Sequence, residues 1–138
     1  MDLPANHFKR GLAAGELQIG LWTQIGNPVA TEVAAGAGYD FVVIDAEHAP
    51  NDVTTVLPLL QVVAGYPVSA VVRPPWSDMV LIKRYLDIGA QTLLIPFIDT
   101  PEQAAEAVSF TRIRSGWPGT GIRVSAGVFV IPMLRCAA

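Results

Sequence analysis

Cysteine and charged residues are both scarce in this sequence of 138 residues. Cys136 is the only cysteine, which excludes an internal disulfide and a metal site built from several thiolates. Charged residues make up 15% of the chain, the net charge is −3, and no run of Lys or Arg occurs. Because nucleic-acid binding depends on clustered cations that neutralise phosphates, we expect no nucleic-acid partner.

The sequence also lacks an unbroken apolar segment long enough to cross a membrane. Its most apolar region, residues 56–72, is interrupted by residues unsuited to a spanning helix, namely Pro58, Gln61, Gly65 and Pro67. The first residues, Met1-Asp2-Leu3-Pro4, lack the basic start and apolar stretch of a signal peptide. We therefore expect a soluble cytoplasmic protein with no membrane partner.

Hydrophobic residues, in contrast, make up 51% of the chain, a surplus that suits parallel strands covered on both faces. Strand-like runs are found at residues 18–22, 41–44, 68–72 and 92–95, with a further one at 128–131. Helix-like segments lie between them, at residues 28–37, 51–63, 78–88 and from 100 onward, and one more surrounds His7. This alternation predicts four βα units of a parallel α/β fold.

Several helix boundaries carry capping residues. Asn51 offers an N-cap to the helix that follows it, and Ser77 or Asp78 does the same for the next helix. Thr100-Pro101-Glu102 places a cap, a proline and an acid in the order typical of a helix start. Gly89 stands where a helix C-cap belongs.

Two architectures fit this alternation, a doubly wound sheet and a (β/α)₈ barrel. The G-x-G-x-x-G fingerprint of a dinucleotide-binding sheet is absent, since Gly36-Ala37-Gly38 lies at a helix end and precedes a strand. Polar residues at the carboxyl ends of strands favour the barrel, because barrel enzymes place their chemistry there. A full barrel needs about 250 residues, so we expect the first four βα units of a truncated barrel.

The candidate chemistry lies in Asp45-Ala46-Glu47-His48, directly after the second strand, and in Arg73, at the end of the third. A histidine beside carboxylates can be held in one tautomer and act as a general base. Arg73 can meet a substrate carboxylate with a bidentate fork. A base and an anion-binding fork on adjacent strand ends suggest proton abstraction from, or aldol cleavage of, a small oxo acid.

Each of these residues also has a structural interpretation. Asp45 and His48 are as well suited to capping the following loop as to catalysis. Arg73 can serve as a structural ion-pair residue, and Glu47 is most simply a solvated loop residue. Trp22, near a strand end, suits packing better than substrate contact.

At these residues the sequence resembles the HpcH/HpaI aldolases, a family that includes 4-hydroxy-2-oxo-heptanedioate and 2-dehydro-3-deoxyglucarate aldolases. The resemblance covers roughly residues 8–112. It rests on five ordered motifs, Gln18–Trp22, Ala35–Asp40, Ile44–Pro50, Val72–Pro74 and Gln91–Pro96.

The resemblance implies a barrel of the phosphoenolpyruvate/pyruvate-binding type that cleaves a 4-hydroxy-2-oxo acid to pyruvate and an aldehyde. It implies a divalent metal, Mg²⁺, Mn²⁺ or Co²⁺, acting as a Lewis acid, and assembly of several copies of the intact protein. By matching position, His48 is the acid/base, Asp45 its orienting partner and Arg73 the residue that stabilises the enolate and carboxylate. Glu47 and Trp22 are candidates for substrate binding.

The sequence departs from the family's pattern in the region that follows the first half of the barrel. The family's metal-binding Glu and Asp lie in a Gln-Ile-Glu and a Gly-Pro-x-Asp-Leu segment, and this sequence contains neither. We therefore expect no metal ligands in this chain, a half barrel over residues 1–112, and an irregular tail over 113–138 from a truncated or frame-shifted reading. We expect this chain alone to be inactive.

Two alternative functions are also compatible with the sequence. One is a non-catalytic module that binds a carboxylate through Arg73 or assembles with a partner through an open sheet edge. The other is a different lyase or epimerase with a phosphoenolpyruvate-binding barrel.

Overall fold

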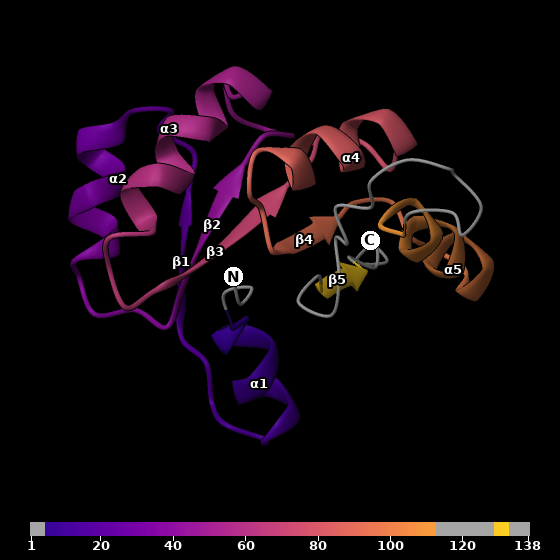
Figure 1. Ribbon diagram of the computed structural model, residues 1–138, viewed down its shortest axis with the longest axis horizontal. Coiled ribbons are helices and arrows are strands. Elements are labelled where there is room, and N and C mark those ends of the chain that lie inside the picture. The colour runs from indigo at the N-terminus through magenta and orange to yellow at the C-terminus, as the bar shows by residue number, and fades with distance from the viewer. Residues whose placement is uncertain (1–4, 113–128, 133–138) are drawn as a thin grey trace, which may run out of the picture.

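The computed structural model describes residues 5–112 and 129–132. These residues contain five helices and five strands (Figure 1). The helices are α1 (His7–Ala13), α2 (Pro28–Ala35), α3 (Val53–Val63), α4 (Met79–Asp87) and α5 (Pro101–Phe110). The strands are β1 (Gly20–Thr23), β2 (Phe41–Asp45), β3 (Ser69–Arg73), β4 (Thr92–Ile95) and β5 (Phe129–Pro132).

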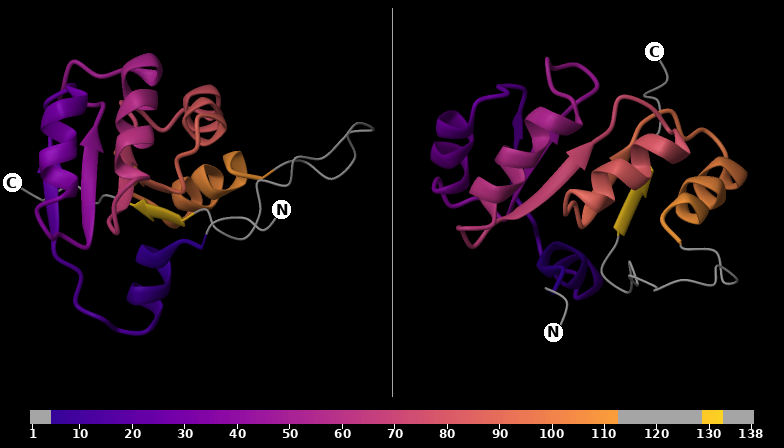
Figure 2. Two further views of the ribbon diagram at one scale, coloured as in Figure 1. Left: turned by 60° about the vertical axis from the view of Figure 1, so that its left-hand side comes forward. Right: turned by 45° about the horizontal axis from the view of Figure 1, so that its top comes forward.

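The strands form one parallel sheet in the order β1-β2-β3-β4-β5, so each strand pairs with its neighbour in the sequence. A doubly wound sheet requires a reversal of strand order, and this sheet has none. Helices α2 to α5 follow β1 to β4 in turn and lie along the outside of the curved sheet (Figures 1 and 2). The fold is therefore that of consecutive βα units of a (β/α)₈ barrel, as predicted.

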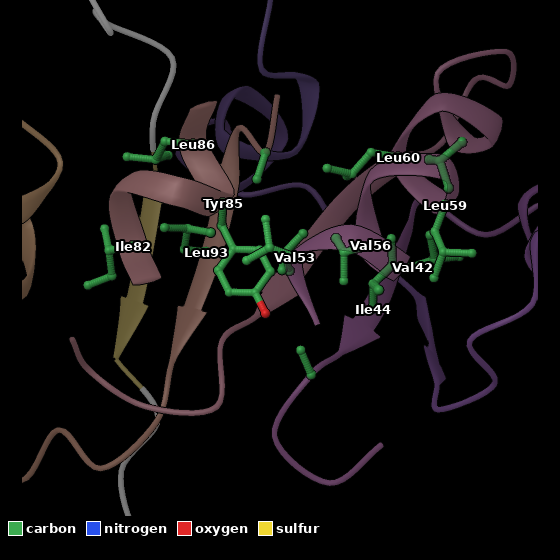
Figure 3. Close-up of a cluster of buried hydrophobic side chains, with 14 of the residues drawn as sticks. Val42, Ile44, Val53, Val56, Leu59, Leu60, Ile82, Tyr85, Leu86 and Leu93 are labelled. Atoms are coloured by element: carbon green, nitrogen blue, oxygen red, sulfur yellow. The ribbon is translucent and has the colours of Figure 1, made fainter. Parts of the chain in front are cut away.

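The two faces of the sheet have different partners because successive side chains of a strand point to opposite faces. Val42 and Ile44 point outward and pack with residues of α3 and α4 in the main core (Figure 3), and Val72 belongs to the same core cluster. Val43 and Val71 point to the inner face, where they form a smaller cluster with Phe8 of α1. Asp45 and Arg73 are two residues further along the same strands, so they too belong to the inner face.

Helix α1 lies against the amino-terminal ends of the strands, as its place in Figure 1 shows. The Asn6 side chain caps α1 by accepting a hydrogen bond from the Lys9 amide at 2.9 Å. It also donates to the Thr92 hydroxyl on β4 at 2.9 Å. The opposite, carboxyl-terminal ends of the strands are left for the polar residues of the site.

Most predicted boundaries agree with the structure, with one correction. The N-cap of α3 is Asp52, which forms a capping box with Thr55, and not Asn51. Pro58 lies inside α3 without ending it. Asp78 rather than Ser77 caps α4, and Gly89 follows that helix with φ +103°, as a C-terminal glycine should.

The predicted strand at 128–131 corresponds to β5, which pairs in parallel with β4 and adds a fifth strand to the predicted four. The rest of the predicted irregular tail lies outside the described residues. Within residues 5–112 and 129–132, no helix is long and apolar enough to span a membrane.

Candidate functional site

The predicted site residues meet at the carboxyl-terminal edge of the sheet. Asp45 is the last residue of β2 and Arg73 is the last residue of β3, and the two stand opposite each other in the strand register. Trp22 of β1 is opposite Val43 and therefore also points to the inner face. The parallel register thus brings together three residues that are up to 51 positions apart in the sequence.

Asp45 is fully buried and accepts hydrogen bonds on both carboxylate oxygens. Its Oδ1 accepts the backbone N–H groups of Glu47 at 2.8 Å and His48 at 3.1 Å. Its Oδ2 accepts the Trp22 indole N–H at 2.9 Å and an Arg73 guanidinium N–H at 3.3 Å. Asp45 therefore ties the loop after β2 to the strands on either side.

Burial by itself raises the pKa of the Asp45 carboxyl group, because it removes the charged form from water. The hydrogen bonds donated by Trp22, by the backbone of Glu47 and His48 and by Gln24 oppose this effect and outweigh it. The pKa of Asp45 is therefore lowered, and the side chain is a carboxylate at neutral pH. A carboxylate held so firmly in its charged form anchors its neighbours and is poorly suited to act as a base.

Arg73 is buried between two carboxylates. One terminal nitrogen pairs with Asp45 at 3.3 Å, and the other pairs with Oε2 of Glu47. The Trp22 ring covers the guanidinium, whose central carbon lies 5.3 Å from the ring centroid. Arg73 thus forms the ion pairs of the structural interpretation, and each of its two terminal nitrogens faces a carboxylate of this chain.

The placement of Glu47 differs from its interpretation as a solvated loop residue, because its side chain is only 7% exposed. Its two oxygens have different partners. Oε2 pairs with Arg73, and Oε1 lies 3.4 Å from Nε2 of the His48 imidazole. The ion pair with Arg73 explains the burial, since a buried carboxylate needs a cation to offset lost hydration.

His48 is the exposed member of the group, with 64% of its side chain accessible. The expected orienting contact from Asp45 to the imidazole is not found. Asp45 accepts the backbone N–H of His48, and the side chain within ion-pair distance of the ring is that of Glu47. Asp45 could not be assigned to one of these two roles from the sequence, because a carboxylate three residues before a histidine can reach either its backbone or its ring.

Two further residues support the site, and the sequence alone did not identify them as site residues. Gln24 follows β1 and points its amide nitrogen at Asp45 Oδ2, at 3.5 Å. Asn51 is buried and donates to the Asp45 backbone carbonyl at 2.7 Å, where a helix N-cap was expected. The signal for Gln24 was its period-two spacing from Trp22, which places both side chains on one face of the strand.

A cavity of about 820 Å³ opens between β1 and α2 beside this cluster. Its walls are mainly apolar, and the polar residues Gln24, Asp45 and Arg73 are among those that line it together with Trp22. A volume of this size with a few convergent polar groups is typical of a small-molecule site.

Replacing Trp22 with phenylalanine tests the indole hydrogen bond in isolation. The variant keeps a ring over Arg73 and loses the donor to Asp45, so we expect the free energy of unfolding to fall by about 1 kcal/mol. Chemical denaturation followed by far-UV circular dichroism measures this change. Trp76→Phe is the matched control; an equal loss in both variants would show that the effect comes from ring size rather than from the Asp45 bond.

The part of the chain that the structure describes contains no group of three or more His, Cys, Asp or Glu side chains placed to hold a metal ion. The two carboxylates nearest the site, Asp45 and Glu47, are both engaged by Arg73. These residues therefore do not fit the metal that the family resemblance implies.

Comparisons with known proteins agree on one family. The model of the HpcH/HpaI aldolase/citrate lyase family matches residues 18–137, and so extends past residue 112, where we expected the resemblance to end. A hydroxypyruvate/pyruvate aldolase of Deinococcus radiodurans is 54% identical over 89% of this chain. A 4-hydroxy-2-oxo-heptane-1,7-dioate aldolase of Salmonella arizonae is 52% identical over 86% of it.

Solved structures show the same relationship. An HpcH/HpaI aldolase/citrate lyase family protein from Burkholderia cenocepacia superposes with a TM-score of 0.83 at 38% sequence identity, covering 93% of this chain and 59% of that protein. The chain spans 43% of the length of both curated relatives named above.

Proposed function

The chain belongs to the HpcH/HpaI aldolase/citrate lyase family, and we propose that it carries the proton-transfer site of an aldolase that cleaves a 4-hydroxy-2-oxo acid to pyruvate and an aldehyde. One observation carries this proposal: an exposed imidazole stands beside a buried, interlocked Asp45–Arg73–Trp22 group at the carboxyl ends of adjacent strands. The relatives named as pyruvate and 4-hydroxy-2-oxo-heptane-1,7-dioate aldolases supply the class of substrate.

In the proposed reaction, His48 removes the proton of the C4 hydroxyl group. The C3–C4 bond then breaks, a carbonyl forms on the departing aldehyde, and the electron pair of the broken bond forms the enolate of pyruvate. The proton is returned to C3 of the enolate, so atoms and charge balance. His48 is suited to this role because its side chain is largely exposed and an imidazole can act both as a base and as an acid.

Arg73 provides positive charge next to the position where the enolate and its carboxylate develop negative charge. Asp45 holds the guanidinium in place from one side, and the Trp22 ring covers it. In this scheme Asp45 positions the cation and the loop and does not exchange protons with substrate. Trp22 lines the adjacent cavity and contacts the substrate there.

A divalent metal, when bound by such an enzyme, supplies Lewis-acid stabilisation of the enolate. Since the described residues do not form a metal site, we propose that they supply only the proton-transfer half of the site. On this proposal, the residues that the structure describes do not by themselves complete the overall cleavage. Three expectations stay predictions. They are that the protein is cytoplasmic, that it assembles with copies of itself, and that it binds a small oxo acid.

Exchange of the pyruvate methyl protons with D₂O tests the proposal, because it requires a base and a stabilised enolate but no aldehyde. We expect the chain, with Mn²⁺ or Mg²⁺ in solution, to accelerate loss of the methyl signal in proton NMR. Absence of acceleration over metal and buffer would contradict the proposed site. Robust release of pyruvate from a 4-hydroxy-2-oxo acid would instead contradict the inactivity of the chain and support the aldolase assignment.

A second candidate function is favoured by a separate observation. Apolar side chains are exposed on α2 and in the segments before and after β1, namely Leu17, Ile19, Ile25, Val29 and Val33. Large apolar side chains exposed in neighbouring segments are typical of a protein interface, so a non-catalytic assembly module is the alternative. A discrete oligomer in size-exclusion chromatography, combined with no acceleration of proton exchange, would favour this second function.

A further inference from the structure

Asn51 has the two terminal atoms of its side chain in different surroundings. The side chain is only 9% exposed, and its Nδ2 donates a hydrogen bond to the Asp45 backbone carbonyl at 2.7 Å. Its Oδ1 is also buried but has no hydrogen-bond partner among the described residues. A buried acceptor without a donor costs free energy, so another feature of the fold has to account for the position of this oxygen.

Gly26, in the loop after β1, accounts for that position. A Cβ atom added to Gly26 would overlap Oδ1 of Asn51, so the oxygen fills the space that the side chain of any other residue would take. The backbone conformation does not require glycine there, because the described glycines with positive φ are Gly15, Gly38 and Gly89. Gly26 is therefore needed for the close approach of Asn51 and not for its own φ.

This contact joins two loops that carry site residues. Gln24 lies two residues before Gly26 and points its amide nitrogen at the Asp45 carboxylate. Ile25, between them, lines the cavity beside the site. The Asn51 bond spans the loop after β2, whose backbone N–H groups also hold the Asp45 carboxylate. Asn51 thus contacts both of the loops that surround Asp45.

We propose that Asn51 is a positioning residue for Asp45, and that the absence of a side chain at Gly26 allows Asn51 to lie between the two loops. Because the amide group is planar, a side chain at position 26 that displaces Oδ1 also moves Nδ2 and breaks its bond to the Asp45 carbonyl. Any effect of this positioning on turnover rests on the proposed function. The contact and its effect on the surroundings of Asp45 do not.

A double-mutant cycle on Gly26→Ala and Asn51→Ala, followed by chemical denaturation, tests the contact. In the wild-type background we expect Gly26→Ala to lower the equilibrium constant for folding by about tenfold, because it breaks a buried hydrogen bond. In the Asn51→Ala background the oxygen is gone, so the same substitution should lower the constant by less than about twofold. Gly36→Ala is the matched control, since a Cβ added there meets its neighbours only at ordinary contact distances.

The indole N–H resonance of Trp22 reports the positioning role, because this group donates to the Asp45 carboxylate. In ¹H–¹⁵N correlation spectra we expect its cross-peak to shift in Asn51→Ala and in Gly26→Ala, while the Trp76 peak stays in place. The double variant should give the same Trp22 peak as Asn51→Ala. Trp22→Phe and Trp76→Phe assign the two peaks. A contact that served stability alone would leave the Trp22 peak where it is.

Several results would overturn the proposal. A loss for Gly26→Ala no larger than that for Gly36→Ala contradicts the close contact, and an equal loss in both backgrounds shows that Asn51 is not its cause. An unmoved Trp22 peak in a destabilised Gly26→Ala chain contradicts the positioning role.

The test also survives a failure of Gly26→Ala to fold. The double variant should then fold as well as Asn51→Ala does, and a double variant that stays unfolded beside a folded Asn51→Ala overturns the proposal. In the wild type, absence of a nuclear Overhauser effect between the Gly26 Hα protons and the Asn51 side chain overturns it without any variant. None of these measurements requires turnover, so a negative pyruvate exchange assay is a separate result.

Discussion

Replacing Asp45 with asparagine is expected to lower the free energy of unfolding by about 3 kcal/mol, the low end for removing one partner of a buried ion pair. The variant keeps the size of the side chain and loses its charge. Arg73 then remains buried with only Glu47 as a counter-ion, which is why we expect the low end of the range. The Trp22 indole N–H and the backbone N–H groups of Glu47 and His48 also lose a charged acceptor.

Chemical denaturation of wild type and variant measures this difference. Asp87→Asn is the matched control, because Asp87 is exposed at the end of α4 and the same change in chemistry there should shift stability by no more than about 0.5 kcal/mol. A similarly small loss for Asp45→Asn would contradict the interlocked arrangement of Asp45, Trp22 and Arg73.

The same carboxylate predicts a pH dependence. The pKa of Asp45 is lowered in the folded chain from its ordinary value of 3.8. The unfolded chain therefore takes up the proton first as the pH falls, and the stabilising contribution is present above pH 3.8 and is lost progressively below it. Asparagine does not titrate, so the stability difference between wild type and Asp45→Asn should shrink as the pH falls through this range. A constant difference would contradict the lowered pKa.

Replacing His48 with asparagine is expected to reduce the rate of pyruvate methyl-proton exchange by about 10²- to 10⁴-fold, the usual contribution of a general base. The actual loss is bounded by the background exchange in buffer and metal. Because the His48 side chain is largely exposed, we expect the free energy of unfolding to stay within about 0.5 kcal/mol of the wild type. The combination of lost exchange and retained stability distinguishes a base from a structural residue.

His7→Asn is the matched control for this experiment, since His7 is exposed on α1 at the opposite end of the strands. It should leave the exchange rate unchanged. Equal rates in wild type and His48→Asn would show that another group, or metal-bound hydroxide in solution, removes the proton.

The βα alternation of the fold could be predicted from the sequence because its signals are local. Phe41–Val42–Val43–Ile44 is apolar and β-branched over too few residues for a helix, and it forms β2. Thr100-Pro101-Glu102 begins α5 at the predicted residue, since capping and the fixed φ of proline act within one turn. Asn51 was misassigned because two adjacent residues, Asn51 and Asp52, both suit an N-cap and local sequence does not choose between them.

The positions of the candidate site residues at the carboxyl ends of strands also followed from the sequence, because that placement depends only on where each strand ends. The sequence alone thus determined the βα order, the family resemblance and the grouping of Asp45, Glu47, His48 and Arg73. Only the tertiary structure decided their partners. The parallel register sets Asp45 opposite Arg73 and brings the Trp22 indole to the same carboxylate, so Asp45 holds an arginine and a loop instead of an imidazole. Such pairings depend on contacts across strands, and no pattern within a single segment encodes them.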